Sequence, residues 1–266
     1  MQTRQLESLE ISVLDPDVIE QRSVVHVTEY RLPNNEDVRL NTVFDPRMGP
    51  FSYGRTCGTC GSDYHTCPGH FGHIQCSKPF YQPFFLNQVY KIVQTSCWYC
   101  FQQSSSRTTC DSCGRRQGKW SRSGTFKDQF SHRVNRSITK LTSTNVLQIL
   151  KKYDALYPSK QPTEWLLTTM LPVMPIASRP SIMNKGHWSH NSLTHTYSSI
   201  VKENDILTAF QRQAQPPHII DTQWRRAQDM VYKIYDVKAS SNDRVYCEGI
   251  RQRLDGKQGR FRKNLL

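Results

Sequence analysis

Cysteine pairs with two intervening residues constrain the fold of this chain more than any other feature of its sequence. Each pair can place two soft ligands on one tight turn, and two such turns supply the four ligands of a tetrahedral zinc ion. The chain has two sets of paired ligands in its first half, one of which ends in a histidine. It is therefore expected to fold locally around two metal ions.

The first set lies in residues 45–78, where Gly, Cys, His and Pro are dense and no apolar period is sustained. Its spacing predicts one zinc ion with four ligands, which are Cys57, Cys60, Cys67 and His70. Glycines in or after each turn let the backbone bend closely around a metal. Other donors compete for the fourth position, and the spacing favours His70 over His65, His73 and Cys76.

The second set has the form of a zinc ribbon, with ligands Cys97, Cys100, Cys110 and Cys113. An apolar face at helical spacing over residues 84–93 runs into this set and predicts a helix that carries its first turn. Four protein ligands close each site and leave no position for a catalytic water, so both ions are predicted to be structural Zn²⁺. A redox-active dithiol is the alternative, but its strand-to-helix context is missing at both sets.

Residues 1–17 contain no apolar segment typical of a secretory signal, and no apolar run approaches the roughly 18 residues of a membrane span. In a reducing compartment, the nine cysteines favour metal binding over disulfides. Cys247 stands apart from both sets and is expected to be a packing or surface thiol. The sequence thus predicts a soluble intracellular chain with no membrane partner.

The formal net charge of +13 favours polyanionic partners, and it is concentrated in residues 101–140 and 244–266. The second stretch sets basic side chains among glycines, an arrangement suited to phosphate contacts that do not read bases. The candidate nucleic-acid-binding residues there are Arg251, Arg253, Lys257, Arg260, Arg262 and Lys263. A solvated surface or a disordered basic tail is the alternative.

Apolar periodicity predicts the regular elements. Alternation of apolar and polar residues at Leu9, Ile11 and Val13 predicts a strand. Asp15-Pro16-Asp17 is typical of a helix cap and first turn. The valines of residues 24–27 predict a second strand before a polar loop at 33–37. Residues 102–142 are expected to form an exposed basic excursion around the second cysteine pair.

Helices are predicted from Thr144, from Thr163 as the N-cap of residues 164–170, near 193–201, and near 224–234 after a break at Pro216-Pro217. The prolines of residues 171–180 predict extended chain. The sequence contains no glycine-rich phosphate loop, no defensible Ser/His/Asp arrangement and no aspartate cluster for two magnesium ions, so the chain alone is predicted to be inactive.

The segment DPRMGPFSYGRTCGTCGSDYHTCPGHFGHI resembles the opening zinc motif of the largest subunit of eukaryotic, archaeal and related viral RNA polymerases. The resemblance puts Cys57, Cys60, Cys67 and His70 on that family's zinc ligands, and Cys97 and Cys100 on the first half of its second clamp zinc site. Cys110 and Cys113 complete the second site by spacing.

LPVMPIASRPSI resembles the family's strand leading to the lid loop, and the C-terminal text resembles the passage from the rudder into switch two. The resemblance implies an α+β clamp head and clamp core segment, with irregular zinc knuckles on a largely helical body. The implied parts are an N-terminal strand and helix (1–43), a region with both zinc sites (44–142), a helical core with a lid-like loop near 180–192 (143–239), and a basic C-terminus (240–266).

The implied function is the N-terminal segment of the largest subunit of DNA-directed RNA polymerase, a clamp that holds DNA and the RNA:DNA hybrid. The family's DFDGD loop, which binds Mg²⁺, is absent from this chain, so nucleotidyl transfer is expected only in the assembled enzyme. The implied partners are the second-largest subunit and the remainder of the largest subunit, in the nucleus, or in the cytoplasm or virion for a viral source.

Features of polymerase classes I and II are mixed, and the short length is expected to reflect a split gene, an intron or intein boundary, or an incomplete gene model. A stand-alone zinc-ribbon regulator that binds nucleic acid, derived from a polymerase gene, is the alternative function.

Overall fold

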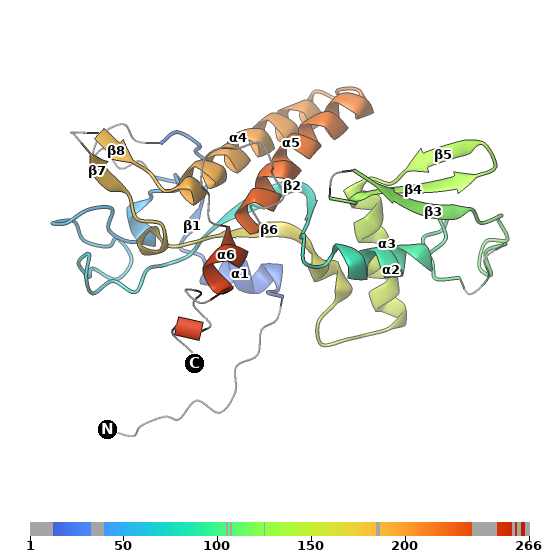
Figure 1. Ribbon diagram of the computed structural model, residues 1–266, viewed down its shortest axis with the longest axis horizontal. Helices are drawn as coiled ribbons and strands as arrows, with labels where there is room; N and C mark the ends of the chain where they lie inside the picture. Colours follow the sequence, from blue (N-terminus) through green and yellow to red (C-terminus); the bar gives the residue numbers. More distant parts are fainter. Residues whose placement is uncertain are drawn as a thin grey trace, which may run out of the picture.

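A computed structural model describes residues 13–32, 40–104, 106, 108–124, 126–184, 187–235, 249–256, 259 and 262–263. The predicted mixed α+β class is confirmed, because helices and three small sheets alternate along the chain. Figure 1 shows a long helical hairpin above a central sheet, loop-rich chain at one end, and a second sheet with two helices at the other.

The central sheet has the order β1 (Val25–His26), β2 (Gly72–Tyr81) and β6 (Leu167–Val173). β1 runs parallel to β2, and β6 runs antiparallel to it with a register shift between Gln75 and Phe80. The prediction of a helix over residues 164–170 was wrong, since only a 3-10 turn, η2 (Thr163–Leu166), precedes β6. Pairing with β2 overrides local propensity, and Pro172 is tolerated because β6 is an edge strand.

The helical hairpin consists of α4 (Ser192–Arg212) and α5 (Pro217–Tyr235), as the sequence predicted. Asn191 caps α4 by accepting the N–H of Leu193, and Pro217 occupies the first position of α5. Ala214 turns the chain between them with a φ of 50°. Within the described part of the chain, no helix combines the length and apolarity needed to cross a membrane.

Side-chain amides fasten this hairpin to the free edge of β2. Asn204 accepts the N–H of Ser77 at 2.9 Å and donates to the carbonyl of Gln75 at 3.0 Å. Gln228 repeats the arrangement on both backbone groups of Tyr81, at 2.8 and 2.9 Å. Both amides are buried, so they replace the ladder bonds that a further strand would have supplied.

The second unit contains α2 (Leu86–Gln94), α3 (Ser143–Leu156) and an antiparallel sheet of β3 (Lys119–Ser123), β4 (Gln129–Val134) and β5 (Ser137–Lys140). The predicted helices at both positions are confirmed. The expected excursion over 102–142 was wrong in its second half, because β3–β5 form a regular sheet. Phe130 and His132 point into the core, where Phe130 stacks on Tyr90 of α2.

Shorter elements complete the fold. Asp15 caps α1 (Pro16–Arg22) as predicted, and β1 is the observed part of the second predicted strand. The expected extended chain over 171–180 is interrupted by a 3-10 turn, η3 (Ile176–Ser178). A hairpin of β7 (Ile182–Asn184) and β8 (His187–Ser189) follows, and α6 (Ile250–Leu254) lies near the described end. Leu9, Ile11 and the loop at 33–37 lie outside the described residues.

Candidate metal centres and basic C-terminal segment

The first candidate metal centre brings together the four residues expected from spacing. One donor atom from each of Cys57, Cys60, Cys67 and His70 lies within 4.8 Å of the others, and the Cys60 and Cys67 sulfurs are 3.8 Å apart. Nε2 of His70 is buried without a hydrogen-bond partner among the described residues. A role as a metal ligand would explain why this ring nitrogen is buried without a hydrogen-bond partner.

The three competing donors lie in other surroundings. The ring of His65 packs against Tyr53 at 5.4 Å between ring centroids, and Nδ1 of His73 lies 2.8 Å from Oγ of Ser23. Cys76 contacts the carbonyl of Ile74 at 3.8 Å. The structure thus assembles the four-ligand set that spacing favoured and leaves the competitors outside it.

The second candidate centre gathers four sulfur atoms. All four donor atoms lie within 4.8 Å of one another, with 3.7 Å between Cys97 and Cys113 and 3.6 Å between Cys100 and Cys110. Nε2 of Gln117 also donates to the Cys97 sulfur at 3.1 Å. Each sulfur from one turn faces a sulfur from the other, so the geometry suits one shared ion better than two separate redox dithiols.

The same backbone turn recurs at three of the ligand pairs. The N–H of the first cysteine donates to the carbonyl five residues later, and its carbonyl accepts the N–H four residues later. These bonds join Cys57 to Ser62 and Gly61, Cys97 to Gln102 and Phe101, and Cys110 to Arg115 and Gly114, all at 2.8 to 3.0 Å. The residue four positions after the first cysteine has a positive φ in each turn, which is 70° at Gly61, 60° at Phe101 and 67° at Gly114.

Phe101 occupies a backbone conformation that glycine fills in the other two turns. Its ring lies 6.4 Å from that of Trp98 and 5.9 Å from Nζ of Lys152, which also donates to the carbonyl of Cys100. These contacts offset the strain of a bulky residue in the left-handed region.

The turn Pro46–Met48, η1, holds both halves of the first centre through three successive carbonyls. Pro46 accepts the N–H of Gly58, Arg47 accepts Oγ1 of Thr59 at 2.7 Å, and Met48 accepts the N–H of His70 at 3.1 Å. These hydrogen bonds attach both metal-binding loops to the same turn.

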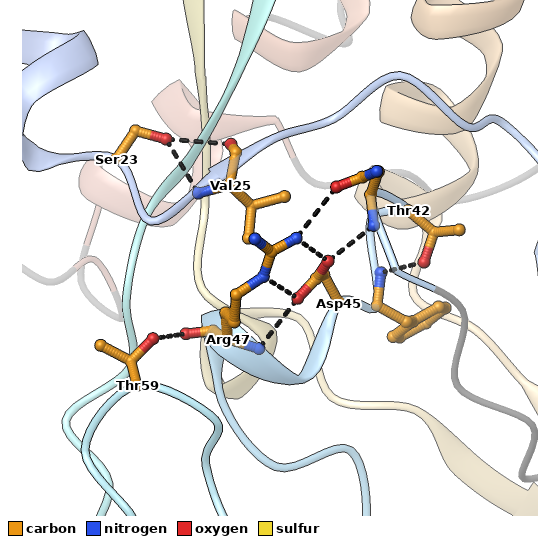
Figure 2. A network of polar contacts seen from close by, with 8 residues as sticks. Ser23, Val25, Thr42, Asp45, Arg47 and Thr59 are labelled. Atoms are coloured by element: carbon orange, nitrogen blue, oxygen red, sulfur yellow. Dashed lines mark hydrogen bonds and ion pairs between the residues drawn. The ribbon is translucent and has the colours of Figure 1, made fainter.

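Asp45 organises that turn, as Figure 2 shows. Its carboxylate is fully buried and accepts the N–H groups of Asn41 and Arg47 together with two guanidinium nitrogens of Arg47. Burial raises the pKa of Asp45, but hydrogen bonds and the charge of Arg47 outweigh it, so the pKa lies below its usual value. The aspartate thus remains ionised beneath the metal loops.

Thiol acidity differs within each cluster. Hydrogen bonding with Ser62 lowers the pKa of Cys60 to about 6, whereas burial raises that of Cys67 to about 11. Burial also raises the pKa of Cys100 to about 12, while backbone N–H groups overcome burial at Cys110 and lower its pKa to about 6. Crowded ligands hold their protons unequally in this way, and a divalent cation would displace the remaining ones.

Both donor sets therefore fit zinc, which prefers four sulfur and imidazole ligands in tetrahedral arrangement. The ligand atoms come from closed turns with no carboxylate among them, which does not suit Mg²⁺ or Ca²⁺. An ion at either position would hold loops together and would have no open coordination position for chemistry.

The basic C-terminal residues are not equivalent. Arg251 and Arg253 lie on α6, with Arg251 exposed and Arg253 half-buried. Arg253 donates to the carbonyl of Ser178 at 2.6 Å and to Oδ1 of Asn191 at 3.2 Å. Its guanidinium therefore joins α6 to the start of α4. Arg262 and Lys263 are exposed, and Lys257 and Arg260 lie outside the described residues.

Arg179 is a buried cation that spacing arguments missed. It is 0% exposed and donates to the carbonyls of Met174 and Val43 and to Oγ1 of Thr194. Burial lowers its pKa to about 10. Its guanidinium also lies 5.5 Å from the ring centre of Phe44, so one side chain links η3, α4 and the segment before η1.

The capping role of Asp45 could have been predicted from the sequence, because Asp45-Pro46 repeats the Asp-Pro pattern that predicts the cap of α1. Nothing local distinguishes Arg179, because its partners lie up to 136 residues away.

Comparison with known proteins extends over the whole chain. The family described as RNA polymerase Rpb1, domain 1, matches residues 3–102 and 100–265. The DNA-directed RNA polymerase subunit Rpo1N of Sulfolobus acidocaldarius is 27% identical, over 100% of this chain and 36% of its own length. Rpo1N of Methanocaldococcus jannaschii is 28% identical, over 98% of this chain and 23% of its own length. Rpo1N of Thermoplasma acidophilum is 26% identical, over 99% of this chain and 35% of its own length. The chain thus spans between 23% and 36% of the length of these relatives.

Proposed function

Because the chain belongs to the RNA polymerase Rpb1 domain 1 family, the N-terminal part of the largest RNA polymerase subunit, we propose that it forms the clamp that holds DNA and the RNA:DNA hybrid during transcription. The observation that carries this proposal is the pair of four-ligand clusters within a chain that matches the family almost from end to end. Two structural Zn²⁺ ions would stabilise the loops without taking part in chemistry.

Phosphate contacts suit this role, since a clamp on moving DNA must bind without reading sequence. The exposed cations Arg251, Arg262 and Lys263 are the proposed contacts in the described part of the C-terminal segment. Lys257 and Arg260 extend the proposed set beyond it. Arg253 would act by holding α6 in place, because its guanidinium already binds Ser178 and Asn191.

The proposed division of the chain remains 1–43, 44–142, 143–239 and 240–266. The hairpin β7–β8 lies within the proposed lid-like loop at 180–192. Arg179 precedes it and fixes its base to α4 through Thr194. The hairpin is thus a short projection on a rigid foundation, which fits an element that separates strands.

Nucleotidyl transfer would require the assembled polymerase, with its Mg²⁺ held by another part of the largest subunit. The proposed partners are that remainder of the subunit and the second-largest subunit, together with template DNA and the hybrid. The three relatives reported above are archaeal, so we propose the cytoplasm in place of the nucleus as the compartment.

Affinity capture of a tagged chain from its native cells, followed by a moderate-salt wash and mass spectrometry, tests this function. Recovery of the second-largest subunit and of a polypeptide carrying DFDGD would support it, with a tag-only capture as control. A chain that elutes alone, folded and with two zinc ions, would contradict it and would support the stand-alone nucleic-acid-binding regulator.

A further inference from the structure

A cavity of about 280 Å³ lies where the hairpin helix α5, the end of β2, the sheet β3–β5 and the start of α3 meet. Its size is near the lower end of small-molecule pockets, which begin at roughly 300 Å³. None of the metal ligands or C-terminal cations discussed above lines it. The cavity is therefore separate from the proposed zinc and nucleic-acid sites.

One side of the cavity is the N-terminus of α3, a helix of 14 residues. Thr142 caps the N–H of Asn145, but no described group accepts the N–H of Ser143 or Thr144. Free N–H groups and the positive end of a helix dipole attract anions.

Ser143 supplies a second and independent observation. It lines the cavity, is only 3% exposed, and its Oγ has no hydrogen-bond partner among the described residues. A buried hydroxyl without a hydrogen-bond partner is energetically unfavourable. A ligand oxygen in the cavity would remove that cost.

The charges around the cavity leave an excess of cations. Among the carboxylates, Asp221 pairs with Arg225 at 3.0 Å, and Asp128 accepts the hydroxyl of Tyr232 at 3.0 Å. Lys78 and Lys140 also line the cavity, and no ion pair joins either to a carboxylate of the described residues. Burial lowers the pKa of Lys78, although the charge of Asp221 opposes this, so this ammonium is already partly removed from water.

Apolar side chains make up much of the remaining lining, with Phe130, Leu141, Ile220 and Trp224 among them, and Gln129 and Thr142 add polar groups. A fully hydrated inorganic ion would leave these side chains without contacts, whereas a ligand with an apolar body would cover them. The lining therefore combines cationic and hydrogen-bonding groups with apolar side chains.

We propose that this cavity is a binding site for a small organic anion, in which the phosphate or carboxylate faces Ser143, Lys140 and Lys78 and the apolar body contacts Trp224 and its neighbours. The site goes beyond the clamp function, and either proposal can fail without the other. Its position between α5 and the β3–β5 sheet means that a bound ligand would join the hairpin to the second unit.

Isothermal titration calorimetry on the zinc-loaded 266-residue chain tests this site with phenyl phosphate, benzoate and inorganic phosphate as probes. Saturable 1:1 binding of phenyl phosphate or benzoate is expected, and the tighter of the two identifies the anionic group. Inorganic phosphate should bind at least about tenfold more weakly because it lacks the apolar contacts.

Lys140→Gln and Ser143→Ala should each weaken the tighter probe by about tenfold, the effect of losing one charge-assisted or buried hydrogen bond. Lys119→Gln is the matched control, since this exposed lysine lies in the same sheet and does not line the cavity. Circular dichroism melting of every variant checks that the fold is retained.

Absence of saturable binding for both organic probes would overturn the proposal. So would equal affinities of the wild type and both cavity variants, or inorganic phosphate binding as tightly as the organic probes.

Discussion

The carboxylate of Asp45 accepts hydrogen bonds from Nε and Nη2 of Arg47 at 2.9 and 2.7 Å, directly beneath the first metal centre. The aspartate is 0% exposed while the arginine side chain is 40% exposed, so one partner of the pair is buried and the other is in contact with solvent. Its main consequence is structural, because the same turn presents the carbonyls that hold the Cys57 and His70 loops.

Asp45→Asn should lower the free energy of unfolding by about 2 kcal/mol, because a buried charge-assisted pair is replaced by weaker neutral bonds. Urea denaturation of the zinc-loaded chain measures this loss. Glu164→Gln is the control, since its ion pair with Lys151 is largely exposed and should contribute less than about 1 kcal/mol. Equal losses in the two variants would show that the buried pair does not organise the turn.

Removal of single ligands should separate the two metal centres. Cys60→Ser and Cys113→Ser are each expected to reduce bound zinc from two ions to one, measured by mass spectrometry of the native protein. The centres share no ligand, so the second ion should remain. Cys76→Ser is the control and should keep both ions; loss of both ions in either ligand variant would mean that the centres fold as one unit.

Gly61→Ala should destabilise the first knuckle by about 1 kcal/mol for a purely conformational reason. The φ of Gly61 is 70°, and a Cβ there would meet no atom within 4 Å. Gly61→Asn should cost less, because asparagine tolerates the left-handed region better. Urea denaturation compares them, and an alanine variant as stable as the asparagine variant would contradict this account.

Acid should destabilise the β3–β5 sheet through His132. This side chain is buried and its Nε2 accepts the N–H of Gly118 at 2.9 Å, so only the neutral ring fits. Burial lowers its pKa below 6.5. Because the folded pKa is the lower one, the stabilisation is complete above about pH 6.5 and is lost as pH falls through the folded value.

An NMR titration of the His132 ring checks this directly, independently of zinc. A midpoint below 6.5 is expected. A His132 midpoint at or above 6.5 would contradict the burial argument.

The triple variant Arg251→Ala, Arg262→Ala, Lys263→Ala should weaken DNA binding by the assembled polymerase and reduce its salt dependence, since each phosphate contact releases counterions. Zinc content should not change, because these residues lie outside both clusters. Arg226→Ala, at an exposed position on α5, is a control for the removal of a single surface cation outside the C-terminal segment. An unchanged salt slope for the triple variant would exclude these residues as phosphate contacts.

The metal clusters could be predicted because ligand spacing is a local property, and the structure brings together the same eight donors. The capped helices were predictable for a similar reason, as Thr142 and Asn145 form a capping box at the start of α3. The choice between His70 and its competitors also followed from spacing alone.

The first half of β6 and the β3–β5 sheet were missed because their conformation depends on partners, whereas the extended chain predicted from residue 171 covers the end of β6. Residues 167–170 have no strong strand signal until β2 pairs with them, and the alternation around Trp120 and Phe130 is hidden by the basic residues between them. The burial of the Arg179 guanidinium and of the Asn204 and Gln228 amides could not be predicted either, because polar residues in a sequence normally indicate an exposed position.

The hydrogen bonds from the side-chain amides of α4 and α5 to β2 also imply an order of folding events during translation. The metal clusters close within residues 57–70 and 97–113, whereas Asn204 and Gln228 reach back 127 and 147 residues to β2. Short loops close at lower entropic cost, and N-terminal segments emerge first during translation. Zinc can therefore be captured co-translationally, while one edge of β2 stays uncovered until the hairpin is made and is open to pairing with another chain during that interval.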